Sequence, residues 1–170
     1  IAEYKSEYFA GEIFAMAGAK ERHNLIISNI IGELYQLLKM KPCKIYPSDM
    51  RVKVSESGLY TYPDISVVCA KAEFLDNHTD TLLNPVVLFE ILSESTESYD
   101  RGKKFQFYRS IQSLQEYVLV STTQRKIEKF KRDNKNWILS ESEEGQILTL
   151  ESIDCGLNLD DVYDKVDWTQ

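Results

Sequence analysis

The sequence predicts an α/β protein of the α+β type, in which helices flank one central mixed β-sheet and additional strands follow near the C-terminus. Residues 20–39 carry apolar side chains at helical spacing, whereas residues 62–70 and 85–92 are apolar almost throughout and rich in β-branched residues. Strands of that second kind are usually buried on both faces. Because domains usually contain about 100–200 residues, we expect a single domain over residues 1–170.

The first half of the chain is predicted to hold a hairpin, one long helix and three strands. Residues 4–16 alternate weakly around Gly11, which favours a short two-stranded hairpin. The helix over 20–39 ends before Lys41-Pro42. Its apolar face consists of Leu25, Ile26, Ile30, Leu34, Leu37 and Leu38. The strands that follow are expected at 43–46, 50–54 and 62–70, the first two around the turn Pro47-Ser48-Asp49.

The second half is predicted to hold a buried strand at 85–92, a second helix and three further strands. Residues 93–98 (SESTES) form a polar break with several residues that cap helices well, so a helix is expected over 100–110. Its core-facing residues would be Phe105, Phe107, Tyr108 and Ile111. The later strands are expected at 116–120, 126–130 and 137–139, with an Asp133-Asn134 turn between the last two.

The composition is that of a globular protein, with 43% hydrophobic and 28% charged residues. The longest apolar run, residues 82–92, is too short to span a bilayer and contains Glu90. Glu3, Lys5 and Glu7 at the beginning of the sequence are incompatible with the apolar core of a signal peptide. We therefore expect a cytoplasmic protein with no membrane partner.

Cysteine and histidine are scarce, which limits the kinds of site that the chain can form. Cys43, Cys69 and Cys155 are odd in number and far apart, so they indicate neither a disulfide framework nor a zinc site, and we expect them to be reduced and packed. The two histidines, His23 and His78, leave little room for a zinc centre or a Ser-His-acid hydrolase. Carboxylates must therefore carry any catalysis.

Asp64 and Glu90 are the strongest candidates, because each interrupts an otherwise apolar strand. An unpaired buried carboxylate costs several kcal/mol, so it is normally paired, protonated or bound to a cation. Two converging carboxylates repel each other, and a hard divalent cation removes that penalty. Mg²⁺ fits best, since it binds one or two carboxylates and leaves its other positions to water and phosphate. The alternative is a simple salt bridge to Lys or Arg at a strand end, which is commoner for a single acidic residue.

Lys104 follows Glu90 in the sequence at a spacing that would allow it to reach the proposed metal site. Asp100, Lys104 and Tyr108 share one helix face at i, i+4 and i+8 spacing. Beside a metal, Lys104 could orient the attacking water and stabilise the charge that develops on a phosphate. Taken alone, the spacing favours an intrahelical Asp100–Lys104 pair worth a few tenths of a kcal/mol.

Together these residues resemble a known family of nucleases. The resemblance rests on Tyr62-Pro63-Asp64, Glu90-Ile91-Leu92-Ser93, Ser95-Thr96, Asp100-Arg101-Gly102-Lys103-Lys104 and Tyr108, preceded by Gly11-Glu12 and by the early helix with His23. This ordered set is similar to the PD-(D/E)XK superfamily, and more narrowly to its bacterial Uma-type family, from about Tyr8 to Val120. The resemblance implies a restriction-endonuclease-like core and an endonuclease that hydrolyses DNA with a Mg²⁺-activated water, with Mn²⁺ as a possible substitute.

The resemblance also implies roles for individual residues. Asp64, Glu90 and the backbone carbonyl of Ile91 would bind the metal ion. Leu92 occupies the position two residues after Glu90 where a lysine is expected. Lys104 on the following helix would replace that lysine. The adjacent Lys103 is the second candidate for this role.

Other residues and one alternative stay open. Glu12 would be an additional acidic residue of the site. For His23, composition favours packing or capping over a place in the site. The alternative to an enzyme, suggested by Leu92, is an inactive nuclease-fold protein that binds nucleic acid or a partner protein.

The net charge of -7 is unevenly distributed along the chain. Residues 1–100 hold 9 basic and 15 acidic side chains, residues 101–135 hold 10 and 3, and residues 136–170 hold 1 and 9. A phosphate backbone could therefore meet the basic block 101–135, where Arg101, Lys103 and Arg109 lie closest in sequence to the candidate site. The alternative is an ordinary solvated face. Restriction-like nucleases often pair to cut two strands, so a homodimer is a further expectation.

Overall fold

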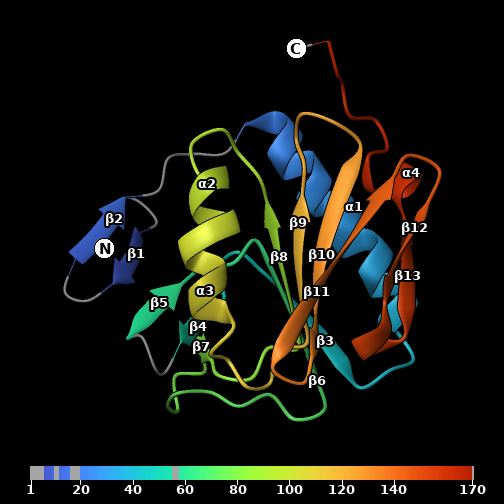
Figure 1. Cartoon of the computed structure of the whole chain (residues 1–170). Helices are drawn as coiled ribbons and strands as arrows, with labels where there is room; N and C mark the ends of the chain where they lie inside the picture. The colour runs from blue at the N-terminus through green and yellow to red at the C-terminus, as the bar shows by residue number, and fades with distance from the viewer. Residues whose placement is uncertain (1–5, 10–11, 16–19, 55–57, 170) are drawn as a thin grey trace.

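A six-stranded mixed sheet forms the centre of the structure, a computed structural model that describes residues 6–9, 12–15, 20–54 and 58–169 (Figure 1). Its strands are β3 (Cys43–Pro47), β6 (Ile65–Cys69), β8 (Val87–Ile91), β9 (Glu116–Val120), β10 (Lys126–Asp133) and β11 (Asn136–Glu143). They lie in the order β11-β10-β9-β8-β6-β3, and all neighbours are antiparallel except β8 and β9, which are parallel. The predicted central mixed sheet is confirmed.

Two smaller sheets complete the β structure. The first has the order β2-β1-β5-β4-β7, and the second pairs β12 with β13. The bounds are β1 (Ser6–Phe9), β2 (Glu12–Ala15), β4 (Arg51–Val54), β5 (Leu59–Thr61), β7 (Thr81–Leu82), β12 (Ile147–Leu150) and β13 (Cys155–Asn158). The pairing of β1 with β2 confirms the early hairpin, although its turn at Gly11 lies outside the described residues.

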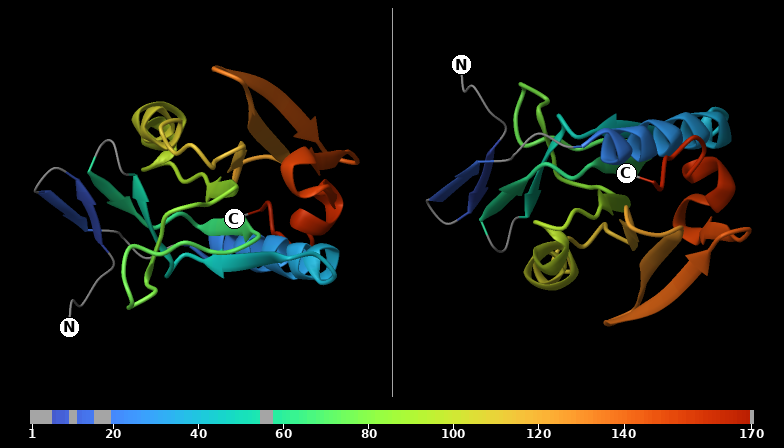
Figure 2. Two further views of the ribbon diagram at one scale, coloured as in Figure 1. Left: turned by 90° about the horizontal axis from the view of Figure 1, so that it is seen from below. Right: turned by 90° about the horizontal axis from the view of Figure 1, so that it is seen from above.

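Helices cover both faces of the central sheet. Helix α1 (Glu21–Leu38) lies on one face, and a continuous helical segment lies on the other (Figure 2). That segment, called the helical segment 97–108 below, consists of α2 (Glu97–Tyr99), the π-helical turn η1 (Asp100–Lys104) and α3 (Phe105–Tyr108). The chain ends with the 3₁₀ turn η2 (Glu151–Ile153) and with α4 (Leu159–Val162). No helix within the described ranges is long and apolar enough to cross a membrane.

Alternate residues of the central strands form two separate hydrophobic cores. Ile65, Val67 and Phe89 pack against α1 and the C-terminal elements. Val68 and Leu88 point the other way and pack with the aromatic residues of the helical segment 97–108. This double burial explains why the strands read as continuous apolar runs, because neither face of the sheet centre meets water.

Several element boundaries differ from the prediction. The strand expected over 62–70 is shorter, since β6 covers Ile65–Cys69, and the short strand β5, which ends at Thr61, precedes it as an element that was not predicted. The second helix begins at Glu97, not at residue 100, and β10 and β11 each extend to eight residues. The long hairpin arises because β10 pairs along its whole length with β11, which local composition does not reveal.

The expectation that all three cysteines are reduced is wrong. Cys43 and Cys69 form a disulfide although they are 26 residues apart in sequence. They occupy directly paired positions on the antiparallel strands β3 and β6, so the sheet brings their side chains together. Cys155 is free and half-buried, and burial raises the pKa of its thiol to about 11.

Candidate functional site

Asp64 immediately precedes β6, and Glu90 lies on the neighbouring strand β8. The two strands are antiparallel, and Ile65 pairs with Phe89. Asp64 precedes Ile65 and Glu90 follows Phe89, so both acidic residues lie at the same end of this strand pair. The charge of Asp64 is close enough to contribute to raising the pKa of Glu90. The structure therefore brings together the two acidic residues that the sequence singles out.

Asp64 is held at one carboxylate oxygen. The Ile91 backbone N–H donates a 2.7 Å hydrogen bond to Oδ2, and Nε2 of His23 lies 3.3 Å from the same oxygen. The Asp64 side chain is 14% exposed. His23 lies in the first turn of α1, so the sequence-based preference for a packing or capping role missed its place beside Asp64. The sequence offers no local signal for this contact, since the two residues belong to distant elements.

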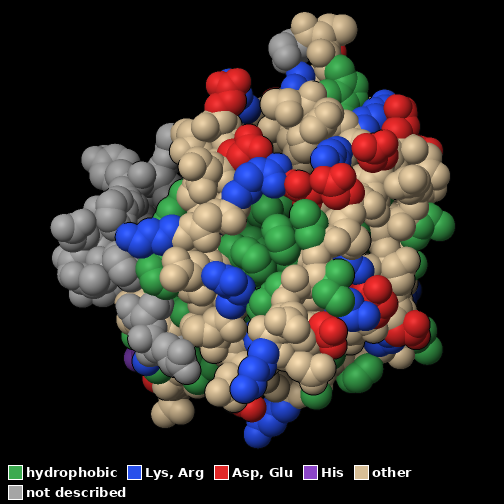
Figure 3. Space-filling view, in the orientation of Figure 1, with side chains coloured by type: hydrophobic (Ala, Val, Ile, Leu, Met, Phe, Trp, Pro, Cys, Tyr) green, Lys and Arg blue, Asp and Glu red, His purple; other side chains and the backbone are tan. Residues whose placement is uncertain are grey.

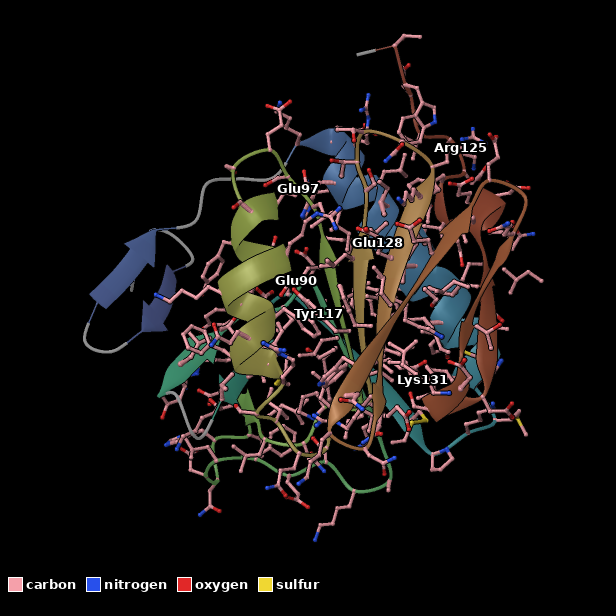
Figure 4. The ribbon with its side chains drawn as sticks, viewed as in Figure 1. Glu90, Glu97, Tyr117, Arg125, Glu128 and Lys131 are labelled. Carbon is pink, nitrogen blue, oxygen red and sulfur yellow. A yellow bond between two sulfur atoms is a disulfide. The ribbon has the colours of Figure 1, made fainter. Side chains whose placement is uncertain are left out.

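Glu90 is buried beneath the helical segment 97–108 (Figure 4). Its Oε1 lies 2.8 Å from Nζ of Lys104 and accepts a 3.0 Å hydrogen bond from the Tyr108 hydroxyl. Burial raises the pKa of Glu90 well above its usual value, Lys104 opposes that shift, and the charges of Asp100 and Asp64 add to it. Glu90 is therefore a carboxylate whose ionised form needs positive charge nearby.

Lys104 joins Glu90 to a third carboxylate. Its Nζ lies 3.3 Å from Oδ1 of Asp100, one helical turn earlier, and both residues are buried. Burial raises the pKa of Asp100 as well, with Lys104 opposing the shift. Lys103 is exposed, and its Nζ lies 5.9 Å from the centre of the Phe107 ring. The helix thus turns Lys104 toward the carboxylates and Lys103 away from them.

Hydroxyl groups form hydrogen bonds around the buried cluster of Glu90, Asp100 and Lys104. The Tyr108 hydroxyl is 3.0 Å from Oγ1 of Thr61, and the Tyr117 hydroxyl donates a 3.0 Å hydrogen bond to the Asp100 carbonyl. Sequence reasoning placed Tyr108 on the Lys104 face but missed Thr61 and Tyr117. The cluster also contains the π-helical turn η1, a distortion that often occurs at functional sites and that the sequence did not indicate.

The site carries more negative than positive charge. Glu90 and Asp100 share the buried Lys104, and Asp64 adds a third carboxylate near Glu90. Within the described ranges, no cluster of three or more His, Cys, Asp or Glu side chains is arranged to hold a metal ion. However, Oδ1 of Asp64 and Oε2 of Glu90 accept no hydrogen bond from the residues described. Two carboxylates with available oxygens are what Mg²⁺ commonly takes from a protein, so Asp64, Glu90 and the Ile91 carbonyl could hold one.

Many cations of the basic block 101–135 pair with carboxylates, and Figure 3 shows Lys and Arg side chains interspersed with Asp and Glu side chains on one face of the molecule. Arg101 pairs with Glu97 and Glu128, and Arg109 is exposed with its guanidinium 5.1 Å from the Phe105 ring centre. Further pairs are Arg125–Glu144, Lys126–Glu141, Lys129–Glu116, Lys129–Glu151 and Lys131–Glu151. Three of these carboxylates, Glu141, Glu144 and Glu151, come from the acidic C-terminal segment, so this surface is not a continuous basic face.

Glu12, the additional acidic candidate, lies in β2. Strand β2 is at the edge of the sheet that also contains β5, which ends at Thr61 beside the site. The Glu12 side chain is outside the part of the chain whose side chains the structure describes. Its proposed role therefore stays a prediction.

Comparison with known proteins identifies the family. The model of the Uma2 family, described as "Putative restriction endonuclease", matches residues 2–161. Protein sll1609 of Synechocystis sp. (strain ATCC 27184 / PCC 6803 / Kazusa) is 36% identical over 141 residues, 82% of this chain and 80% of the relative. Protein slr1290 of the same organism is 34% identical over 160 residues, 94% of this chain and 83% of the relative.

A solved structure shares the fold. The crystal structure of "a putative nuclease belonging to DUF820" from Anabaena variabilis ATCC 29413 superimposes with a TM-score of 0.78. The match covers 95% of this chain and 91% of that chain at 18% sequence identity. Because the family model spans almost the whole sequence, the chain belongs to the Uma2 family and is nuclease-like.

Proposed function

We propose that the protein is a Mg²⁺-dependent endonuclease that hydrolyses DNA phosphodiester bonds. The observation that carries the proposal is the neighbouring pair of carboxylates Asp64 and Glu90, with Nζ of Lys104 2.8 Å from Oε1 of Glu90. Membership of the Uma2 family, described as "Putative restriction endonuclease", supports the reaction class. Mn²⁺ would replace Mg²⁺, since both accept carboxylate, carbonyl and water oxygens.

The proposed roles follow from the contacts of each group. Asp64, Glu90 and the Ile91 carbonyl would bind the cation, because they combine two carboxylates with a backbone oxygen. A bound Mg²⁺ would supply Lewis-acid activation of water and offset negative charge on the phosphate. Lys104 fixes Oε1 of Glu90 and offers an ammonium group to orient water and to stabilise the charge of the transition state. Glu12 would add an acidic group from β2.

DNA binding is proposed to involve Lys103, Arg109 and Arg101. Lys103 and Arg109 are exposed, and their cationic groups lie 5.9 and 5.1 Å from the ring centres of Phe107 and Phe105 in the helical segment 97–108. Arg101 is shared with two carboxylates, so it would contribute less. Replacing Lys103 should raise KM with little change in kcat, whereas replacing Lys104 should lower kcat. Cleavage kinetics on a labelled duplex distinguish the two lysines.

A plasmid assay tests the proposal. Supercoiled DNA is incubated with purified protein in Mg²⁺, in Mn²⁺ and in EDTA, and nicked product is followed on gels. Asp64→Asn, Glu90→Gln and Lys104→Met should each reduce nicking by about 100-fold or more, as expected when a group that stabilises the transition state is lost. The controls are Asp161→Asn and Lys71→Met, which change exposed residues of α4 and of the turn after β6. Nicking activity that persists in Asp64→Asn or Glu90→Gln would refute the proposed roles of these residues in a Mg²⁺-dependent endonuclease.

A second candidate function is DNA or protein binding without cleavage. It is favoured by Leu92, which is 3% exposed and packed in the core on the side of the helical segment 97–108, where the usual lysine is expected. DNA binding by the unaltered protein with no cleavage in Mg²⁺ or Mn²⁺, and no Mn²⁺ bound at millimolar concentration, would support this function. It would also exclude the endonuclease.

A further inference from the structure

His23 makes a contact that packing alone does not explain. Its Nε2 lies 3.3 Å from Oδ2 of Asp64, and its side chain is 16% exposed. The other ring nitrogen, Nδ1, is buried and has no hydrogen-bond partner among the residues that the structure describes. An unsatisfied buried polar atom costs about 1–3 kcal/mol. A phenylalanine would fill a similar space without that cost, so the contact with Asp64 needs a reason of its own.

The contact adds to a directional arrangement around Asp64. The Ile91 N–H and His23 Nε2 approach the same oxygen, Oδ2, one from β8 and one from α1. Oδ1 accepts no hydrogen bond from the residues described. Two groups from two rigid elements therefore fix the rotation of the carboxylate and leave its other oxygen available.

We propose that His23 is a positioning residue that holds Asp64 through Oδ2 and so presents Oδ1 to the cation. The inference rests on the proposed function, since Asp64 must bind that cation. This role requires a proton on Nε2 that points toward Asp64, with Nδ1 unprotonated. His23 touches neither DNA nor the cation, so it acts only through the geometry of Asp64.

Mn²⁺ binding by the DNA-free protein tests the inference apart from activity. Titration followed by electron paramagnetic resonance should show a loss of affinity of about 10-fold or more for His23→Ala and His23→Phe, as is typical when a group that orients a metal ligand is removed. His23→Gln, whose amide N–H reaches a similar position, should stay within about 3-fold. The control is His78→Ala, which changes an exposed loop residue. Thermal denaturation of each variant identifies any that fails to fold.

The outcomes separate the two proposals. Equal Mn²⁺ affinity in the unaltered protein, His23→Ala and His23→Phe would overturn the role of His23 and leave the metal site intact. If the unaltered protein binds no Mn²⁺, the proposed function fails, and the positioning role, which rests on it, is overturned as well.

A nitrogen spectrum tests the contact itself. The sequence contains only two histidines, so long-range ¹H–¹⁵N correlations resolve both rings. His23 should show a protonated Nε2 and a bare Nδ1, and Asp64→Asn should shift its signals but not those of His78. A His23 signal that does not respond to Asp64→Asn would also overturn the inference.

Discussion

Replacing Lys104 with methionine should destabilise the fold, and the loss of stability should be larger at pH 7 than at pH 5. Methionine keeps a long unbranched side chain but removes the charge from between two acidic groups. The Nζ atom lies 2.8 Å from Glu90 and 3.3 Å from Asp100, and the three side chains are 4–5% exposed. Lys104→Met therefore leaves two buried carboxylates without their lysine.

The expected loss of stability follows from that burial. Removing one partner of a buried ion pair typically costs 3–5 kcal/mol, because the remaining charge is left uncompensated. For a chain of 170 residues, this corresponds to a fall of roughly 6–20 °C in Tm. The double variant Glu90→Gln with Lys104→Met should be more stable than Lys104→Met alone, since only Asp100 is then left unpaired.

The pH dependence has a defined sign. Burial raises the pKa of Glu90 and of Asp100 in the native state, while Lys104 lowers both. An acid whose native pKa is raised binds its proton more tightly in the folded than in the unfolded state, so stability falls as pH rises from the unfolded value through the native one. Removing Lys104 raises the native pKa values further. The deficit of Lys104→Met should therefore be largest near pH 7 and shrink at pH 5.

Urea denaturation at pH 5 and pH 7 measures this effect, with Lys71→Met as the control for loss of an exposed lysine. A deficit below about 1 kcal/mol at pH 7 would show that Lys104 does not compensate the buried charge, since that is the scale of an exposed pair. A deficit that grows on acidification would contradict the argument equally.

Three further predictions concern other parts of the fold. Reduction of the Cys43–Cys69 disulfide, which joins residues 26 apart, should lower stability by roughly 3.5 kcal/mol in thermal denaturation with dithiothreitol, and the double serine variant should not respond. The hydrogen bond with Glu116 is the main cause that lowers the pKa of Glu151 to about 2. Glu151→Gln should therefore lower the free energy of unfolding by about 1 kcal/mol at pH 7 and by progressively less from pH 4.5 down to 2, as measured by urea denaturation. Because burial raises the pKa of Cys155 to about 11, iodoacetamide should modify it slowly at pH 8 until the protein is unfolded.

The fold was predictable where burial imposes a uniform pattern. Helix α1 shows its apolar positions at 3.6-residue spacing, and β6 and β8 are apolar because both faces of the sheet are covered. The C-terminal elements were predicted only in part, as additional strands. In β12, buried Leu148 and Leu150 alternate with exposed residues over only four positions, which is too short a pattern to indicate a strand without its partner β13.

The site was predictable as far as single residues conflict with their surroundings. A carboxylate within an apolar strand is conspicuous, which identified Asp64 and Glu90. Contacts between distant elements were not predictable. The approach of His23 to Asp64 and the pairing of Cys43 with Cys69 depend on how α1 and β3 pack beside β6, and no spacing along the chain records that.

Basic and acidic side chains that are separate along the sequence lie side by side in the folded structure. The basic block and the acidic C-terminal segment are separate in sequence, but β11 and η2 bring Glu141 and Glu151 against lysines of β10. Counterion release on binding DNA scales with the number of cations that contact phosphates, and a lysine already paired with a carboxylate gains less from a phosphate. An interface on this protein would therefore depend on cations that these carboxylates do not neutralise, such as Arg109, and not on the whole basic block.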